Sequence, residues 1–246
     1  MRDTPRRSRG SLYQEVMRQL IDDIQRGVVG PGDALPSESE LAQRFKVSIG
    51  TLRRAVDGLV ADNILVRQQG RGTFVGRQDR DRFMFQFFKI AARDGTLQFP
   101  EVRLHAFQRS RPNEIQARRL GIQLTDAVFC IDNVLALGGR PVVHDHIVIP
   151  AALFDGLNRI GFAGRTGTIY ELYQSDFGVT IVGAHERIRA ESMAMSSASL
   201  LGLRAGVPAL RIERLAYTFN TVPVEFRVSV VDTREFEYVS DLEAPV

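Results

Sequence analysis

Hydrophobic residues near the start of the chain recur with the spacing of an α-helix. In the segment "SLYQEVMRQLIDDIQRGVV", Leu12, Val16, Leu20 and Ile24 follow one another every four residues. Residues at this spacing fall on one side of a helix, so they form an apolar stripe that can pack against a core. The next segment, "GPGDALP", is rich in glycine and proline and ends the helical pattern.

Two further helices are predicted before residue 64. Ser37 is a favourable N-cap for "SESELAQRF", and Glu40, three residues later, completes a capping box. After the short link "KV", Ser48 can cap a third helix in "SIGTLRRAVDGLVADN". The apolar residues that predict the buried face of this third helix are Leu52, Val56, Leu59 and Val60.

A β-hairpin is predicted directly after the third helix. In "ILVRQQGRGTFVG" two short apolar runs flank Gly70-Arg71-Gly72, and glycine permits the tight turn. The order helix, helix, turn, helix, hairpin is that of a winged helix-turn-helix, which places one helix in the major groove of DNA. Arg71, at the tip of the hairpin, suits the negative potential of a minor groove. The predicted exposed face of the third helix is small or cationic, as contact with bases and phosphates requires: Ser48, Gly50, Thr51, Arg53 and Arg54.

Charge is distributed unevenly along the chain of 246 residues. Residues 1–78 carry 13 Lys/Arg against 9 Asp/Glu, whereas residues 79–246 carry 19 against 20. The net charge of +3 therefore comes from the first third, as expected of a module that binds a polyanion. An ordinary solvated surface with a basic tail would give the same numbers, so the charge alone does not decide between the two.

Several other classes of protein are disfavoured by composition. The start of the chain is basic and is not followed by an apolar run, and no apolar run of about 18 residues occurs, so we expect a cytoplasmic protein without a signal peptide or membrane span. The single cysteine, Cys130, excludes an internal disulfide and a multi-cysteine metal site. Because it lies in "AVFCI", we expect it to be a buried hydrophobic residue.

The first third of the chain resembles the DNA-binding domain of the GntR family of bacterial transcription regulators. Residues 12–76 carry the resemblance in "LYQEV", "GDALPSESELAQRFKVS", "TLRRAVDGL" and "GRGTFV". Many relatives have an arginine where this chain has Ile49, which can contact a thymine methyl group or simply pack. Gly50 and Arg54 are candidate DNA-contacting residues because they lie on the predicted exposed face of the third helix. The resemblance implies the other candidates, with Ile49 at the position of the relatives' arginine: Ser37, Glu38, Ser39, Ser48, Ile49, Thr51, Arg53, Arg71, Gly72 and Thr73.

An internal repeat marks the rest of the chain. Residues 119–150 and 200–232 align with one inserted residue, and Leu120-Gly121 matches Leu201-Gly202. Each copy predicts the end of a helix, a strand, a turn and a return strand. Two such hairpins predict one antiparallel sheet with pseudo-twofold symmetry, covered by helices near 113–120 and 193–201, so the second domain is α+β. The phenylalanines of "RFMFQFFKI" are expected to form a strand against a core or a dimer contact.

The second half resembles the effector-binding domain of the HutC subfamily of the same family, the UTRA domain, whose fold is similar to chorismate lyase. The matching segments over residues 83–240 include "TIYELYQSDFGVTI" and "LLGLRAGVPALRIERLAYTFNTVPVEFRVSVV". The expected organisation is a flexible basic arm at 1–10, a winged helix-turn-helix at 11–76, a linker at 77–84, and an effector-binding and dimerisation domain at 85–246.

The resemblance also implies an effector site. Relatives often carry two arginines that hold an effector phosphate or carboxylate where this chain has Asn133 and Leu135, which argues against a sugar phosphate bound in the usual way. Asp145 and Glu225 match acidic positions of the family. Thr168 and Tyr170 match its Ser/Thr-x-Tyr at a helix start, although Thr168 can be only a cap and Tyr170 only core.

Two further groups of polar residues on the predicted hairpins need an interpretation: Arg227 with Glu225, and His144 with His146. Arg227 lies two residues from Glu225 on one strand face and either replaces the missing arginine clamp or forms an ion pair on the solvent face. His144 and His146 share a face and Asp145 points away, so a metal site is not expected and the histidines are assigned ordinary partners.

Three functions fit these observations. The favoured one is a transcription regulator, by default a repressor, that binds double-stranded DNA as a homodimer on a palindromic operator and whose affinity changes with a small-molecule metabolite. The second is an enzyme on the lyase-like fold, and the third is a DNA-binding protein whose second domain only dimerises. The second domain shows no nucleophile–base set, phosphate loop or metal spacing, so neither an enzyme nor a cofactor is expected.

Overall fold

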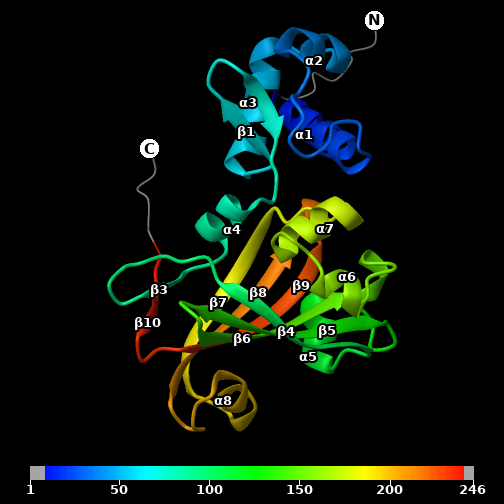
Figure 1. Ribbon diagram of the computed structural model, residues 1–246. Coiled ribbons are helices and arrows are strands. Elements are labelled where there is room, and N and C mark those ends of the chain that lie inside the picture. The colour runs from blue at the N-terminus through cyan, green and yellow to red at the C-terminus, as the bar shows by residue number, and fades with distance from the viewer. Residues whose placement is uncertain (1–8, 241–246) are drawn as a thin grey trace, which may run out of the picture. The chain divides into compact units, whose positions relative to one another are not determined.

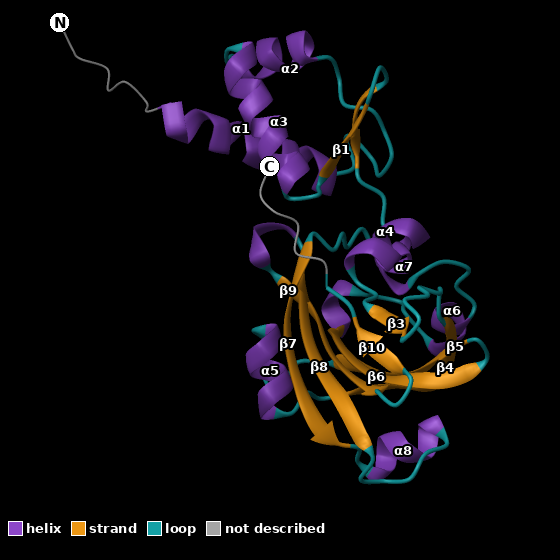
Figure 2. Ribbon diagram, turned by 90° about the vertical axis from the view of Figure 1, so that its left-hand side faces the viewer, coloured by secondary structure: helices purple, strands orange, loops and turns teal. Residues whose placement is uncertain are grey.

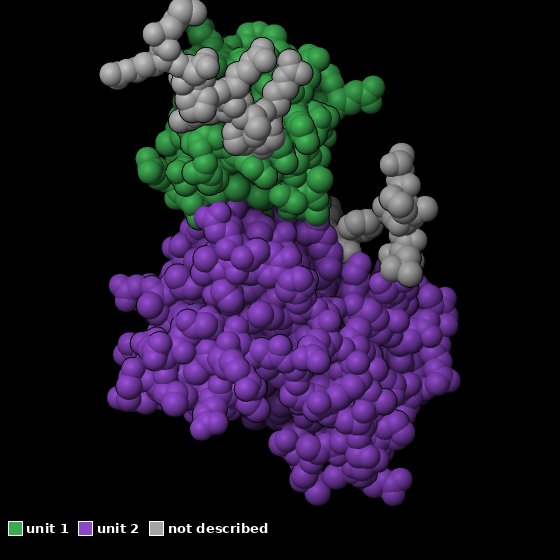
Figure 3. All heavy atoms as spheres, turned by 180° about the vertical axis from the view of Figure 1, so that it is seen from behind, with its two compact units in different colours: residues 1–77 green, residues 78–246 purple. Residues whose placement is uncertain are grey.

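The computed structural model describes residues 9–240 and divides the chain into two compact units, Met1–Arg77 and Gln78–Val246 (Figure 3). Residues 1–8 of the expected basic arm lie outside the described residues. Arg9 and Gly10, its last two residues, instead begin helix α1 (Arg9–Gln25).

The first unit has the predicted order of elements (Figure 1). After α1 come α2 (Glu38–Phe45) and α3 (Ile49–Ala61), then the hairpin of β1 (Leu65–Gln68) and β2 (Gly72–Val75). The apolar stripe predicted for the first helix is buried at Val16, Leu20 and Ile24, and it packs with α3. Local hydrophobic spacing therefore determined these elements correctly.

Polar caps fix the ends of α2 and α3. The Ser37 hydroxyl accepts a hydrogen bond from the Glu40 N–H at 3.3 Å, and the Glu40 carboxylate accepts one from the Ser37 N–H at 2.8 Å. This confirms the capping box. Ser48 caps α3 by accepting from the Thr51 N–H at 3.2 Å, as its position in the sequence predicts.

The second unit is built on a six-stranded antiparallel sheet with the strand order β4-β5-β6-β9-β8-β7 (Figures 1 and 2). A two-stranded sheet pairs β3 (Ile90–Ala92) with β10 (Phe236–Tyr238). The strands of the large sheet are β4 (Glu101–Ser110), β5 (Val128–Leu137), β6 (Arg140–Pro150), β7 (Gly183–Ser192), β8 (Pro208–Tyr217) and β9 (Pro223–Asp232).

The predicted internal repeat is confirmed and is longer than expected. Each half of the sheet contains an outer strand, a short helix and a hairpin, and the two halves meet at β6 and β9. The helices are α5 (Glu114–Leu120) and α8 (Met195–Leu201), and each ends at a glycine with φ 67° and ψ 32°. These glycines, Gly121 and Gly202, adopt the left-handed conformation that glycine accepts without strain.

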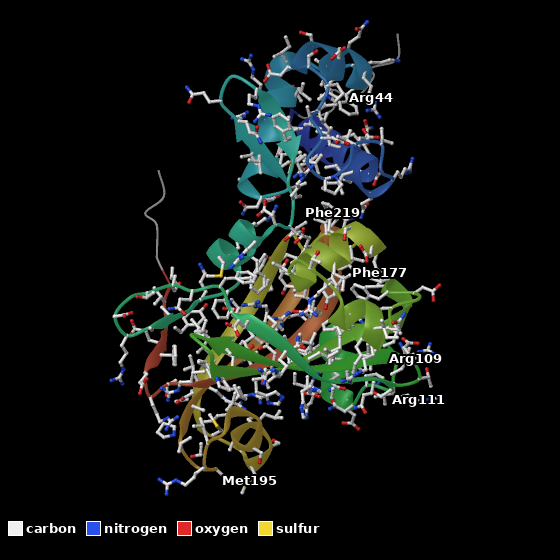
Figure 4. All side chains as sticks on the ribbon, viewed as in Figure 1. Arg44, Arg109, Arg111, Phe177, Met195 and Phe219 are labelled. Atoms are coloured by element: carbon white, nitrogen blue, oxygen red, sulfur yellow. The ribbon has the colours of Figure 1, made fainter. Side chains whose placement is uncertain are left out.

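Two hydrophobic cores cover opposite faces of this sheet. One face packs against α5 and α8, through residues such as Leu120, Leu201 and the buried Cys130. The other face packs against α4 (Arg80–Gln86), α6 (Arg159–Ala163) and α7 (Ile169–Phe177). Phe177 near the end of α7, labelled in Figure 4, packs edge-on against Phe154 with 5.5 Å between ring centroids.

The expected linker at 77–84 and the strand expected from its phenylalanines are both wrong. The segment forms helix α4, capped by Asp79, whose side chain accepts from the Arg82 N–H at 2.9 Å. Phe83 and Phe87 are four residues apart, so they share one helix face, and both are buried in the core of the second unit. The capping aspartate and this spacing outweighed the β propensity of phenylalanine.

Candidate DNA interface and effector pocket

The first turn of α3 presents small polar side chains and one exposed hydrophobic residue. Ile49 is 44% exposed, and Gly50 beside it is exposed as well. The hydroxyl oxygens of Ser48 and Thr51 lie 2.9 Å apart in a mutual hydrogen bond. This end of the helix therefore offers a methyl-bearing surface and hydroxyl groups without a bulky side chain that would block a groove.

The two arginines of α3 have different surroundings. The Arg53 Nε atom donates to the Glu38 carboxylate on α2 at 2.8 Å, and both side chains are exposed. Such a surface pair contributes little stability but restricts the orientation of the guanidinium group. The Arg54 guanidinium lies 4.3 Å from the ring centroid of Tyr13 on α1, which gives Arg54 a packing contact that sequence reasoning missed.

The hairpin after α3 carries Arg71 at its exposed tip. Gly70 and Gly72 have φ values of 72° and 114°, and an added Cβ on either would meet no neighbouring atom within 4 Å. Glycine is needed at both positions because of the backbone conformation rather than for lack of space. The Arg71 guanidinium lies 5.7 Å from the centroid of the Phe74 ring. Thr73 is half-buried.

The other predicted DNA-contacting residues lie at the start of α2. The Ser37 hydroxyl is engaged in the capping box, since it also donates to Glu40 at 2.7 Å. Ser39 is exposed. At the other end of α2, Arg44, labelled in Figure 4, pairs with Asp23 of α1 at 2.8 Å and so ties the two helices together.

The second unit contains a cavity of about 430 Å³ on the face of the sheet that α6 and α7 cover. Four of the six predicted effector residues line it: Asn133, Asp145, Thr168 and Arg227. Asn133 and Asp145 lie opposite each other in the β5–β6 register. The rest of its wall includes Phe83, Phe99, Pro100, Val102, Arg103, Leu104, Leu135, Ala163, Arg165, Thr166, Gly167 and Ile169.

Tyr170 and Glu225 do not line this cavity and are completely buried beside it. The Glu225 carboxylate accepts hydrogen bonds from the hydroxyls of Tyr170 and Tyr173, at 2.9 and 3.0 Å. It also accepts two from the Arg227 guanidinium, both at 3.0 Å. Burial, reinforced by the negative charge of Glu225, raises the pKa of Tyr170 well above its usual value.

Arg227 is held by two carboxylates. Besides Glu225, it donates to Asp145 at 3.0 Å, and Asp145 also accepts from Ser229. Burial opposes the charge of Arg227, but the adjacent Glu225 and Asp145 outweigh it and hold the pKa of Arg227 well above its usual range. The expected solvent-face ion pair is therefore an ion pair of the buried face, and its charge is already balanced by the protein.

Sequence reasoning missed Arg165, in the loop between α6 and α7. Its Nη1 atom donates to the Phe162 carbonyl at 2.6 Å, and the guanidinium lies 4.3 Å from the Phe162 ring centroid. No acidic residue forms a salt bridge with it among residues 9–240. Desolvation lowers the pKa of Arg165, and the nearby charge of Arg227 adds to this effect. Its position directly before a predicted helix start was the available signal.

Asn133 has an unsatisfied polar atom at the cavity. The residue is 2% exposed, and its Oδ1 atom has no hydrogen-bond partner within the part of the chain that the structure describes. A buried acceptor without a donor is costly and uncommon in folded proteins. The cavity wall therefore offers a bound molecule one buried acceptor, Asn133 Oδ1, and two arginines without a salt bridge among residues 9–240, the half-buried Arg165 and the exposed Arg103.

The two histidines of β6 lie on the opposite face of the sheet from Asp145. His144 Nε2 and His146 Nδ1 contact the same Asp132 oxygen at 3.1 and 2.9 Å, and His144 Nδ1 lies 3.0 Å from the Ser197 hydroxyl. They have ordinary protein partners. Across residues 9–240 no group of three histidine, cysteine or acidic side chains is arranged to hold a metal ion.

A winged helix-turn-helix joined to a sheet domain with a ligand-sized cavity defines a ligand-modulated DNA-binding regulator. Sequence comparison agrees. Residues 12–75 match the family of bacterial regulatory proteins named gntR, and residues 98–237 match the UTRA domain. The chain belongs to the GntR family, in its HutC subfamily.

Known proteins are similar over most of the chain. An Escherichia coli (strain K12) protein named "Probable fructoselysine utilization operon transcriptional repressor" is 30% identical over 225 residues, 91% of each chain. The repressor NagR of Bacillus subtilis (strain 168) is 29% identical over 231 residues, 93% of each chain. The crystal structure of the ligand-binding domain of a protein described as a GntR-family regulator from Bordetella bronchiseptica has a TM-score of 0.62 at 29% identity, covering 64% of this chain and 98% of that one.

These findings decide between the three functions considered from the sequence. The protein is a DNA-binding transcriptional repressor modulated by a ligand of its UTRA domain, and it is not an enzyme. PhnF from Mycobacterium smegmatis shares the two-domain fold at a TM-score of 0.53 and 22% identity, covering 94% of this chain and all of that one. No helix in residues 9–240 is long and apolar enough to cross a membrane.

Proposed function

We propose that this repressor binds a palindromic operator as a cytoplasmic homodimer, with α3 in the major groove and the β1–β2 hairpin against the backbone or minor groove. The observation that carries the DNA contact is the start of α3, where the exposed Ser48, Ile49 and Gly50 and the half-buried Thr51 leave room for base edges. Two copies related by a twofold axis would read half-sites about one helical turn, or a multiple of it, apart.

Roles within this interface follow from the contacts described above. Arg53 is proposed to read a base or phosphate after exchanging its weak pairing with Glu38. Arg71 and Thr73, with the glycines beside them, would contact the backbone or minor groove. The first residues of α2, Ser37 to Ser39, and Arg54 would approach phosphates.

Selection of duplexes from random DNA with the full chain tests this interface. We expect an inverted repeat, and a complex whose mass contains two copies of the chain. Arg53→Ala should weaken binding to the selected duplex by about 1–3 kcal/mol, whereas Arg187→Ala, an exposed arginine of β7, should not. Ile49→Arg should add a preference for guanine at one position of each half-site. If Arg53→Ala and Arg187→Ala bind equally well, the assigned face of α3 is incorrect.

For the effector, we propose a hydroxyl- or amine-bearing molecule with a single negative charge, bound in the cavity beside α7. Arg165 would neutralise the anionic group, which would lie near Thr168, and a donor of the ligand would satisfy Asn133 Oδ1. Asp145 would accept from a second donor. Arg227, Glu225 and Tyr170 would hold Asp145 in place rather than bind the charge, because they satisfy one another.

The names of two relatives support this class of ligand. One refers to fructoselysine utilization, and the other, a repressor from Escherichia coli that is 28% identical over 234 residues, refers to mannosyl-D-glycerate. Both compounds combine sugar hydroxyls with a carboxylate. The buried Arg227 is already neutralised by Asp145 and Glu225, so the half-buried Arg165 is the proposed partner of the ligand's negative charge, with the exposed Arg103 at the edge of the cavity.

A matched ligand series tests the charge. Thermal unfolding of the full chain would be followed with glucose, gluconate and glucose 6-phosphate, which carry zero, one and two negative charges. A ligand at a hundred times its Kd stabilises by about 2.7 kcal/mol, which is roughly 5–11 °C for a unit of this size. We expect gluconate to give the largest shift, and Arg165→Gln to remove it. A larger shift with glucose 6-phosphate would contradict the proposed charge.

A further inference from the structure

The chain passes from the first unit to the second through a very short joint. The Gly76 N–H donates to the Ile64 carbonyl at 2.9 Å, and the Arg77 Nε atom donates to the Pro31 carbonyl at 3.3 Å, both within the first unit. The next residue, Gln78, is the first of the second unit and is 2% exposed. Only one residue, Arg77, separates a backbone anchor of one unit from an anchor of the other.

Gln78 is fixed to α7 and the segment after it. Its N–H donates to the Gln174 side-chain oxygen at 3.0 Å, and its side-chain Nε2 donates to the Ile181 carbonyl at 2.6 Å. The Gln78 carbonyl accepts a long hydrogen bond, 3.4 Å, from the Thr168 hydroxyl. The Gln174 amide is itself oriented by donating to Thr180 at 3.2 Å.

The same helix forms part of the effector cavity. Thr168 caps α7 by accepting from the Glu171 N–H at 3.0 Å, and it lines the cavity. Thr168 therefore touches both the space for a ligand and the backbone of Gln78. Farther along α7, Tyr170 and Tyr173 attach the helix to Glu225 in the sheet.

We infer that Gln78 is the positioning residue through which the effector cavity controls the DNA-binding unit. A ligand at Thr168 changes the position of α7 or of the Thr168 hydroxyl, and the hydrogen bonds of Gln78 pass the change to Arg77. The inference rests on the proposed effector site, but it concerns residues outside both that site and the DNA interface.

The physical reason is that these hydrogen bonds have few intermediate states. A buried glutamine whose bonds are stretched leaves polar atoms unpaired, so the contact is either made or broken. A ligand that favours one of the two arrangements shifts their populations, and a single residue, Arg77, separates Gln78 from the Gly76 anchor of the first unit. Coupling is reciprocal, so DNA binding must also affect α7.

This reciprocity allows a test that needs no effector. Hydrogen exchange of the α7 backbone amides, residues 169–177, would be measured on the full chain with and without a duplex selected from random DNA. We expect the duplex to change the exchange rates in the wild type and in Gln108→Ala, an exposed glutamine of β4. Gln174→Met, which keeps the side-chain length but removes the oxygen that accepts from the Gln78 N–H, should bind the duplex normally and show a smaller change in α7.

A second variant guards against a loss of folding. Insertion of Gly-Ser-Gly-Ser between Arg77 and Gln78 leaves every Gln78 hydrogen bond in place and adds only a flexible segment between the two units. We expect it to melt at the wild-type temperature and to lose the effect of the duplex on α7. Gluconate, if it binds, should alter duplex affinity about 5–150-fold in the wild type and less than about 2-fold in both variants.

The outcomes separate the inference from the function on which it rests. A chain that selects no duplex refutes the proposed operator binding and, with it, the inference. A chain that selects a duplex but shows unchanged α7 exchange in the wild type refutes the inference alone. The same holds if the insertion variant transmits the effect of the duplex as strongly as the wild type does.

Discussion

The buried carboxylate of Glu225 offers the sharpest test of the structure. It is fully buried and accepts four hydrogen bonds, two from tyrosine hydroxyls and two from the Arg227 guanidinium. The substitution Glu225→Gln keeps the shape of the side chain, removes its charge and replaces one acceptor oxygen with a donor NH₂ group. Each Glu225 oxygen accepts from two of the four donors, so two donors then point at the new NH₂ group and lose their acceptor. Arg227 retains only Asp145 as a charged partner.

The expected loss of stability in Glu225→Gln can be worked out from these contacts. A hydrogen bond to a charged group contributes about 1.5–3 kcal/mol, so the loss of two costs roughly 3–6 kcal/mol. Removing one partner of a buried ion pair costs about 3–5 kcal/mol by the same reasoning. We therefore expect the free energy of unfolding of the second unit to fall by about 3–5 kcal/mol, and its Tm to fall by roughly 6–20 °C.

Calorimetry of the full chain measures this loss, with Glu237→Gln on the exposed position of β10 as the charge-matched control. The control should melt within about 0.5 kcal/mol of the wild type. The double variant Glu225→Gln/Arg227→Met should cost less than the sum of its single variants, because it removes the unpaired cation. A Glu225→Gln chain as stable as the control would show that the four hydrogen bonds do not exist in solution.

Three further variants test other parts of the molecule. Ser37→Ala should destabilise the first unit by about 0.5–2 kcal/mol through loss of the α2 cap, whereas Ser39→Ala, measured in the same melts, should have little effect. Tyr170→Phe should cost the second unit about 1.5–3 kcal/mol, and equal stability would mean that its hydroxyl does not donate to Glu225. Burial opposes ionisation of Asp132, but hydrogen bonds from His144 and His146 outweigh it and hold its pKa well below the usual value. Its ionised form therefore adds stability above about pH 4 that is lost as the pH falls toward the lowered pKa, so Asp132→Asn should flatten the decline of Tm in acid, and an unchanged decline would refute the assignment.

Elements with a local signal were predictable from the sequence. The capping box of Ser37 and Glu40 determines the start of α2 because both partners lie within four residues. The matched pairs Leu120-Gly121 and Leu201-Gly202 revealed the repeat because a left-handed helix end favours glycine in each copy. Strand alternation likewise placed Glu225 and Arg227 on one face, where they form an ion pair.

Features that depend on distant residues were not predictable. Phe83 lies in helix α4, which Asp79 caps, and Phe87 is the C-cap residue of that helix. Phe87 packs against Tyr170, far along the chain, at 4.8 Å between ring centroids. The role of Gln78 depends on Gln174 and Ile181, which lie about a hundred residues away in the sequence. Nothing in the local sequence distinguishes Gln78 from an exposed linker residue.

The buried charges on the α7 face of the sheet explain why the cavity lies where it does. Stability favours burial of polar groups only when they are paired, and Glu225, Arg227 and Asp145 satisfy that condition among themselves. Asn133 Oδ1 has no partner among the described residues, and the half-buried Arg165 has no acidic partner there; both residues line the cavity. A core selected only for stability would replace them with apolar side chains. Their retention beside a fully paired network is what a site has when a ligand supplies the missing donor and the missing negative charge.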